Sequence, residues 1–484
     1  MGNRKKLLHF LRADSSALSS SSSPRSFSST SSVSDDDGGG SSSSSFPPSA
    51  ASSPSRHSSP KSPWAAHLPG LADAAASATA TGLVASLVKE GGKVYSLAVA
   101  GDVLYTGTDS ENVRLWRDGR ELARLRTGSG LVKAVVVARD GRIFTGHQDG
   151  KVRVWRADAD DPAVHRRLGS LPALGDLLVS SVNPSSYVRG GRRRRTVVWL
   201  RHSDAVSCLS LDEPAGLLYS ASWDRTLKVW RLADSRCLES LPAHHDAVNT
   251  VAAAGFGGLV LTGSADGTVK AWRREHLHPH PGGGTRHVLE TVLRDGEDGA
   301  ATAVAACAEA RAVYVGASDG LVTCWRWGMD GEPRHAGVLA GHGRMAVMCL
   351  AVSGRVVVSG SADGTVCVWR RDDDRGRADS RYLHVRLAVL AGHTGPVKCV
   401  AVAADEDCGY ADDGERRFVV YSGSLDGSVK VWRLSEEPTT TPAPHPLVPL
   451  REQEAWTPRR PQAPPALPSP VQPWAPELKR VAAA

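Results

Sequence analysis

The chain lacks the features that mark most membrane proteins, secreted proteins and enzymes. Its 484 residues hold no apolar run of the roughly 18 residues that a membrane-spanning helix needs. None of its eight cysteines forms a CxxC pair and no secretory signal peptide is apparent, so we expect a reducing compartment, cytoplasmic, nuclear or both. There is no nucleophile elbow, P-loop, HExxH or dinucleotide motif. We therefore predict no enzymatic activity, no cofactor and no metal site.

Large apolar residues are scarce at both ends of the chain. Residues 1–80 are dominated by serine, and residues 435–484 are rich in proline, threonine and alanine. Neither stretch can bury enough apolar surface to offset its chain entropy, so both are predicted to be disordered tails. The formal net charge of +7 is mild for this length and permits nucleic-acid binding without favouring it. One folded domain over residues 81–434 remains.

That middle part repeats a short pattern seven times. Each copy has a turn of small residues, a strand-like alternation and then Trp-Arg, and in six copies an aspartate stands six residues before the tryptophan. Asp followed by Gly suits a tight hairpin turn, and the alternation has the period of a strand. Such a repeat predicts an all-β, seven-bladed propeller, because single blades cannot bury both faces alone. The copies span residues 107–117, 146–156, 221–231, 263–273, 316–326, 360–370 and 423–433.

The repeats resemble those of the WD40 family over residues 83–433. Four of them carry a pair similar to that family's upstream Gly-His signature, and the distance from His202 to Trp230 equals that from His244 to Trp272. The resemblance implies a buried hydrogen-bonded set of His, Ser or Thr, Asp and Trp in each of these blades. Its expected members are His202, Asp224 and Trp230; His244, Asp266 and Trp272; His342, Asp363 and Trp369; and His393, Asp426 and Trp432.

The chain departs from the family pattern in two respects. Repeats one, two and five lack the upstream histidine, so we expect their blades to depend more on packing. The family's Trp-Asp is Trp-Arg in all seven repeats. Within the family, the segments 183–187, 198–202, 204–209 and 392–399 resemble the plant JINGUBANG-like group, which implies a regulatory interaction protein.

Two structural expectations concern the ring. The apolar stretch Leu83 to Val88 is predicted to supply the outer strand of the blade that ends at Trp432, because closure removes open sheet edges. The interval from Trp155 to Trp230 is too long for one repeat, so we expect an insertion at 157–195, with Thr196 to Leu200 as an outer strand. This insertion and those at 274–285, 371–381 and 403–417 are expected on the face opposite the Asp turns.

Three features are candidate sites. Trp223 occupies a turn position where other repeats have Ala, Leu, Ser or Gln, which favours either an exposed interface anchor or packing on a neighbouring turn. The run Arg192, Arg193, Arg194 and Arg195 is either a phosphate-binding patch or a solvated loop. His276, His278 and His280 lack carboxylate or cysteine support, so we do not assign them a metal.

Together these observations predict a monomeric, non-catalytic scaffold that assembles other proteins, such as transcription regulators or signalling proteins. Nucleic acid and membranes are not the expected partners. Two alternatives remain open. One is nucleic-acid or anion binding through the basic insertion, which would depend strongly on salt. The other is a ubiquitin-ligase substrate receptor, although such WD40 proteins typically dock through a Trp-Asp-x-Arg box and every repeat tryptophan here precedes arginine.

Overall fold

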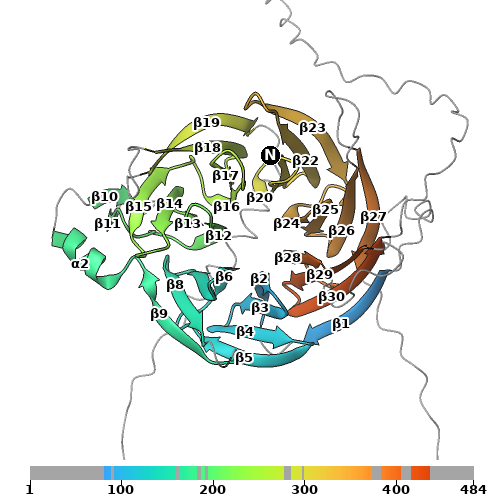
Figure 1. Ribbon diagram of the computed structural model, residues 1–484, viewed down its shortest axis with the longest axis horizontal. Helices are drawn as coiled ribbons and strands as arrows, with labels where there is room; N and C mark the ends of the chain where they lie inside the picture. The colour runs from blue at the N-terminus through green and yellow to red at the C-terminus, as the bar shows by residue number, and fades with distance from the viewer. Residues whose placement is uncertain are drawn as a thin grey trace, which may run out of the picture. The chain divides into compact units, whose positions relative to one another are not determined.

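The computed structural model describes residues 81–88, 92–158, 161, 163–182, 187–190, 195–276, 285–296, 299–372, 383–404 and 416–436. Seven four-stranded antiparallel sheets surround a central axis as the blades of a propeller (Figure 1). The predicted all-β, seven-bladed fold is confirmed. The predicted tails lie outside the described residues, except that the last strand continues to Glu436.

Each blade is a meander in which the first strand lies nearest the axis. Blade 1 contains β2 (Val94–Ala100), β3 (Val103–Thr108), β4 (Asn112–Arg117) and β5 (Arg120–Arg126). Blade 2 contains β6 (Val132–Val137), β7 (Arg142–His147), β8 (Val152–Ala157) and β9 (His165–Leu171). Blade 3 contains β12 (Val206–Asp212), β13 (Leu217–Ser222), β14 (Thr226–Arg231) and β15 (Cys237–Pro242). Blade 4 contains β16 (Val248–Ala253), β17 (Leu259–Ser264), β18 (Thr268–His276) and β19 (Thr285–Asp295).

The remaining three blades follow the same order. Blade 5 contains β20 (Ala301–Cys307), β21 (Ala312–Ala317), β22 (Leu321–Trp327) and β23 (Pro333–Ala340). Blade 6 contains β24 (Val347–Ser353), β25 (Val356–Ser361), β26 (Thr365–Asp372) and β27 (Leu383–Ala391). Blade 7 contains β28 (Val397–Ala404), β29 (Arg416–Ser424) and β30 (Ser428–Glu436), and its fourth strand is β1 (Thr81–Val88).

The ring closes as the sequence predicts. β1 pairs antiparallel with β30, so that Leu83 lies opposite Trp432 and Val88 opposite Ser428. Leu87 is buried and packs in one cluster with Val94 of blade 1 and Val429 of blade 7. The first and last strands of the propeller therefore belong to one sheet.

The core lies between the blades. The buried apolar residues of the described chain form seven clusters, one at each blade interface. At the interface of blades 2 and 3, for example, Phe144 and Val154 pack against Leu218 and Trp230. Because apolar burial is the main driving force of folding, each blade is stabilised chiefly by its two neighbours.

Tyrosine–histidine pairs also cross two of these interfaces. The Tyr219 hydroxyl of blade 3 lies 3.1 Å from Nε2 of His287 in blade 4, whose Nδ1 lies 2.7 Å from a carboxylate oxygen of Glu239. The Tyr314 hydroxyl of blade 5 lies 3.0 Å from Nε2 of His384 in blade 6. These contacts give the otherwise apolar interfaces a directional component.

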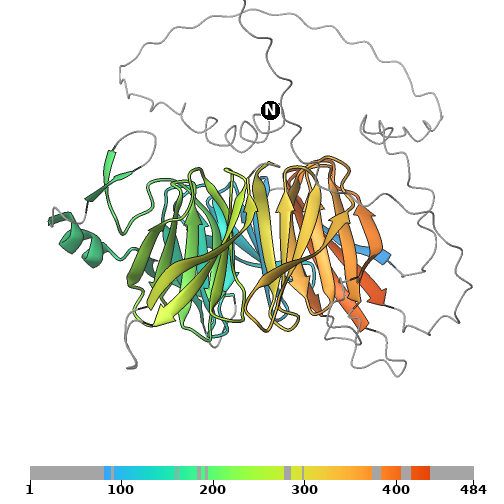
Figure 2. The same ribbon diagram turned by 90° about the horizontal axis from the view of Figure 1, so that it is seen from above.

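The insertion differs from the prediction. The outer strand of blade 2 is β9, and residues 195–198 form β11 (Arg195–Val198), which pairs with β10 (Tyr187–Gly190) in a separate hairpin. Leu171 lies opposite Val152, just after the Asp149 turn, so the insertion begins at the face that carries the Asp turns and not at the opposite face. A helix, α2 (Leu174–Val182), and this hairpin lie outside the ring in both views (Figures 1 and 2). The other three insertions leave from the opposite face, as expected.

Candidate functional site

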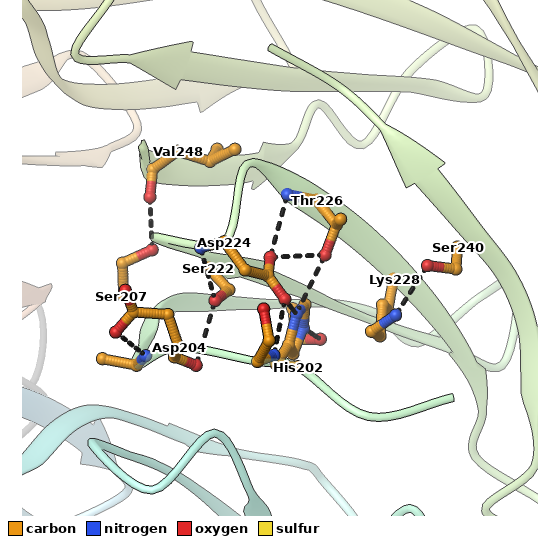
Figure 3. Close-up of polar contacts among 12 residues, drawn as sticks. His202, Asp204, Ser207, Ser222, Asp224, Thr226, Lys228, Ser240 and Val248 are labelled. Carbon is orange, nitrogen blue, oxygen red and sulfur yellow. Dashed lines mark hydrogen bonds and ion pairs between the residues drawn. The ribbon is translucent and has the colours of Figure 1, made fainter. Parts of the chain in front are cut away.

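The buried polar set expected from the repeats is present in blade 3. Trp230 Nε1–H donates to Ser220 Oγ at 2.9 Å, and that hydroxyl lies 2.8 Å from Nε2 of His202. His202 Nδ1 lies 3.1 Å from a carboxylate oxygen of Asp224, at the turn between β13 and β14 (Figure 3). Because the Ser220 oxygen already accepts the indole N–H, its own hydroxyl hydrogen is donated to Nε2 of His202. The imidazole then donates its Nδ1–H to Asp224. We call this chain of four residues the relay.

Local bonds hold the aspartate in place. Asp224 accepts the backbone N–H groups of Ser203 and Thr226 and the hydroxyl of Thr226. Burial opposes ionisation of Asp224, but His202 and these donors together hold the pKa of its carboxyl well below the usual value. Burial lowers the pKa of His202 more than Asp224 raises it. In blade 3 the relay therefore pairs a neutral imidazole with an ionised carboxylate.

Blades 4, 6 and 7 contain the same arrangement. The imidazole Nε2 of His244, His342 and His393 lies 2.7–2.8 Å from the hydroxyl of Thr262, Ser359 and Ser422, respectively. Each of these hydroxyls accepts from the tryptophan of its blade: Trp272, Trp369 and Trp432. The turn aspartates Asp266, Asp363 and Asp426 lie 3.1–3.5 Å from Nδ1 of the histidine. All twelve predicted relay residues thus come together as the resemblance implies.

Blade 2 shows that one expectation was incomplete. Although it lacks the upstream histidine, His147 at the end of β7 is fully buried and its Nε2 lies 2.8 Å from the Thr145 hydroxyl, which accepts from Trp155. Asp149 is instead paired with Arg153 at 2.8 Å. His147, which lies on the second strand of the blade, therefore takes the place of the upstream histidine at this hydroxyl. The signal in the sequence is the histidine of Gly-His-Gln-Asp, where the other repeats have Ser, Thr or Ala.

Blades 1 and 5 lack the histidine, as expected. In blade 1, Trp116 donates to Thr106 and the turn position is filled by Ser110, which lies 2.7 Å from the Thr108 hydroxyl. In blade 5, Val315 takes the place of the accepting hydroxyl, and Trp325 packs edge-on against His335. These two blades depend more on packing.

Trp223 lies on the Asp-turn face but is half-buried rather than exposed. Its backbone N–H donates to the carbonyl of Ala205 at 3.1 Å. The ammonium of Lys133, from β6 of blade 2, lies 4.1 Å from the centre of its indole ring and 5.4 Å from the centre of the Tyr95 ring in blade 1. Side chains from three successive blades meet here, which is feasible only close to the axis.

A feature that the sequence did not reveal explains this convergence. All seven inner strands have a β-bulge after their first residue, at the Asp-turn end of the blade. A bulge leaves one residue outside the ladder and redirects its side chain. The seven bulge residues, which we call the axial ring, are Tyr95, Lys133, Ser207, Asn249, Thr302, Met348 and Lys398.

The remaining predicted sites are only partly described. Arg192, Arg193 and Arg194 lie outside the described residues, and Arg195 begins β11. His276 ends β18, whereas His278 and His280 lie outside the described residues. Within the described ranges, no three His, Cys, Asp or Glu side chains gather into a potential metal site. In the same ranges no helix has the length and apolar character to cross a membrane.

The closed ring of repeats and the relay in four blades define a β-propeller of the tandem-repeat class. The family model described as "WD domain, G-beta repeat" matches residues 119–156, 194–231, 235–273, 333–370 and 384–433. Five of the seven blades thus match the WD40-repeat family. The matched ranges leave out the tryptophan repeats of blades 1 and 5, the two blades without a relay histidine. Propellers of this family generally act as protein-interaction scaffolds and are generally not enzymes.

Individual relatives match only parts of the chain. It is 38% identical over 96 residues to Protein SPIRRIG of Arabidopsis thaliana, which covers 19% of the chain and 2% of that protein. It is 27% identical over 189 residues to WD repeat-containing protein pop1 of Schizosaccharomyces pombe, which covers 34% of the chain and 24% of that protein. The chain thus spans less than a third of the length of these relatives.

Among solved structures, the WD40 propeller domain of Doa1 is similar. The match has a TM-score of 0.51 and 18% sequence identity, and it covers 73% of this chain and 97% of that domain. Identity at this level supports the fold alone.

Proposed function

We propose that the protein is a non-catalytic scaffold that assembles regulatory or signalling proteins on the Asp-turn face of its propeller. One observation carries the proposal: Trp223, Lys133 and Tyr95 converge there from three blades. A half-buried tryptophan with a tyrosine close by offers aromatic surface at one point, and both residue types are enriched at interface hot spots. The relay residues, by contrast, stabilise the fold. We further propose a cytoplasmic or nuclear location and membership in the plant JINGUBANG-like group.

The test compares the proteins that co-purify with the wild-type chain and with Trp223→Ala, identified by mass spectrometry from native tissue. A matched control is Met329→Ala, which removes a side chain that is 89% exposed in the loop between β22 and β23, on the opposite face. All three proteins must first show the same thermal stability. Specific partners lost with Trp223→Ala and kept with Met329→Ala support the proposal. An unchanged partner list would refute the Asp-turn face as the working surface.

A further inference from the structure

The axial ring is chemically divided into two parts. In blades 3, 4 and 5 its residues are neutral and polar, and their side chains bond to the next blade. Ser207 donates to the carbonyl of Val248 at 2.6 Å, Asn249 donates to that of Ala301 at 2.9 Å, and Thr302 donates to that of Val347. This part of the ring connects neighbouring inner strands.

In blades 6, 7, 1 and 2 the ring residues are Met348, Lys398, Tyr95 and Lys133. Met348 and Tyr95 are buried, whereas both lysines are half-buried. The axial ring therefore contains two ammonium groups and no carboxylate. Both ammonium groups belong to these four blades. With the indole of Trp223 beside Lys133, these residues form what we call the basic sector of the ring.

Lys398 is the bulge residue of blade 7, the position that Lys133 occupies in blade 2. Burial is the main influence on the thiols of Cys208, Cys349 and Cys399 and raises their pKa, while the Lys398 ammonium lowers it in all three. Those cysteines lie on the inner strands of blades 3, 6 and 7. The Lys398 charge thus influences groups on three inner strands, in keeping with its place at the Asp-turn end of an inner strand.

The acidic groups nearest in sequence to the ring lie on the other side of it. Asp204 and Asp246 precede the inner strands of blades 3 and 4, and each carboxylate accepts the next backbone N–H, of Ala205 and Ala247, at 2.7 and 2.9 Å. Among the bulge residues and these two aspartates, positive charge thus lies in blades 2 and 7, and negative charge in blades 3 and 4. A ligand with the complementary charge would be oriented across the Asp-turn end of the axis.

We propose that the basic sector binds an acidic linear segment of a partner protein, whose carboxylates contact Lys133 and Lys398 while an apolar side chain packs on Trp223. The inference rests on the proposed function and adds the chemistry of the partner. A linear segment fits better than a folded surface because the lysines are half-buried close to the axis, where only a narrow chain reaches both. Buried charge pairs in such a place determine specificity as well as affinity.

The experiment measures fluorescence anisotropy of a short labelled peptide of aspartate, glutamate and phenylalanine with the full-length protein. An otherwise identical peptide with asparagine and glutamine is the control ligand. The protein variants are Lys133→Met and Lys398→Met, which retain side-chain length and lose the charge. Arg139→Met is the matched control, because that exposed arginine lies in the turn between β6 and β7, on the opposite face.

We expect the acidic peptide to bind the wild type and Arg139→Met alike, and each lysine variant about tenfold more weakly. Binding should weaken as ionic strength rises. Equal binding of both peptides, or unchanged binding by both lysine variants, would overturn the inference. Stronger binding of a short RNA of equal charge would overturn the choice of a protein segment. If co-purified partners depend on Trp223 and not on the lysines, the scaffold proposal survives while the acidic-segment inference fails.

Discussion

The relay in blade 3 allows a quantitative prediction for His202→Ala. The substitution removes the Nδ1–H bond to the ionised Asp224, and hydrogen bonds to charged groups contribute about 1.5–3 kcal/mol. It also leaves the Ser220 hydroxyl buried without its acceptor, which costs about 1–3 kcal/mol. Asp224 keeps its bonds from Ser203 and Thr226, so it does not become an isolated charge. We expect a loss of about 3–5 kcal/mol in the free energy of unfolding.

The measurement is urea unfolding followed by circular dichroism, with thermal unfolding as a second probe. His245→Ala is a suitable control. His245, which follows His244 in the chain, is exposed, so its removal should change the free energy of unfolding by less than about 0.5 kcal/mol. Ser220→Ala tests the same chain from the other side, since it deprives Trp230 Nε1–H of its acceptor. The double variant should cost less than the sum of the single variants, because the two residues share one bond.

Two results would refute this reasoning. A loss below about 1 kcal/mol for His202→Ala would mean that water or a rearranged side chain replaces the imidazole at no cost. Strict additivity of the two substitutions would mean that His202 and Ser220 do not act as one unit.

Three further predictions concern closure, backbone strain and pH. A chain beginning at residue 91 lacks β1 and the buried Leu87, so it should unfold at lower temperature than one beginning at residue 80; equal midpoints in calorimetry would contradict closure by β1. Arg225 has a φ of 75° at the turn position where Gly267 and Gly364 stand in blades 4 and 6, so Arg225→Gly should raise stability by up to about 1 kcal/mol in urea unfolding, and a loss would argue against strain. Burial, aided by the charge of Arg153, lowers the pKa of His147 from 6.5 to about 3. The unfolded chain therefore takes up this proton first, and stability should fall as pH drops from about 6.5 toward 3; a flat profile of unfolding midpoints over that range would count against it.

Much of the fold could be predicted because the same turn-and-strand pattern occurs seven times in the sequence. The distance from the turn aspartate to the tryptophan fixes a hairpin, and the position of Leu83 to Val88 before the first repeat fixes how the ring closes. The relay in blades 3, 4, 6 and 7 followed from residues that recur at matching offsets. Because the pattern recurs, each copy is separate support for the same local structure.

The parts that escaped prediction are those that occur once or depend on register. β9 (His165–Leu171) has little apolar alternation, so the sequence favours Thr196–Leu200 as the outer strand of blade 2 and the face opposite the Asp turns for the insertion, and both predictions are wrong. His147 contacts the hydroxyl that accepts from the tryptophan, as His202 does in blade 3, but it does so from a different strand, which an offset search does not find. The axial ring arises from a one-residue bulge, and no residue type marks a bulge in these seven strands.

The closure by β1 has a consequence for how the protein is made. β1 leaves the ribosome early, whereas its partner β30 follows roughly 340 residues later. At about 5–20 residues per second, an apolar strand would wait on the order of 20 to 70 s for its neighbour. During that interval its edge is open to pairing with other chains, a risk that the closed ring no longer carries.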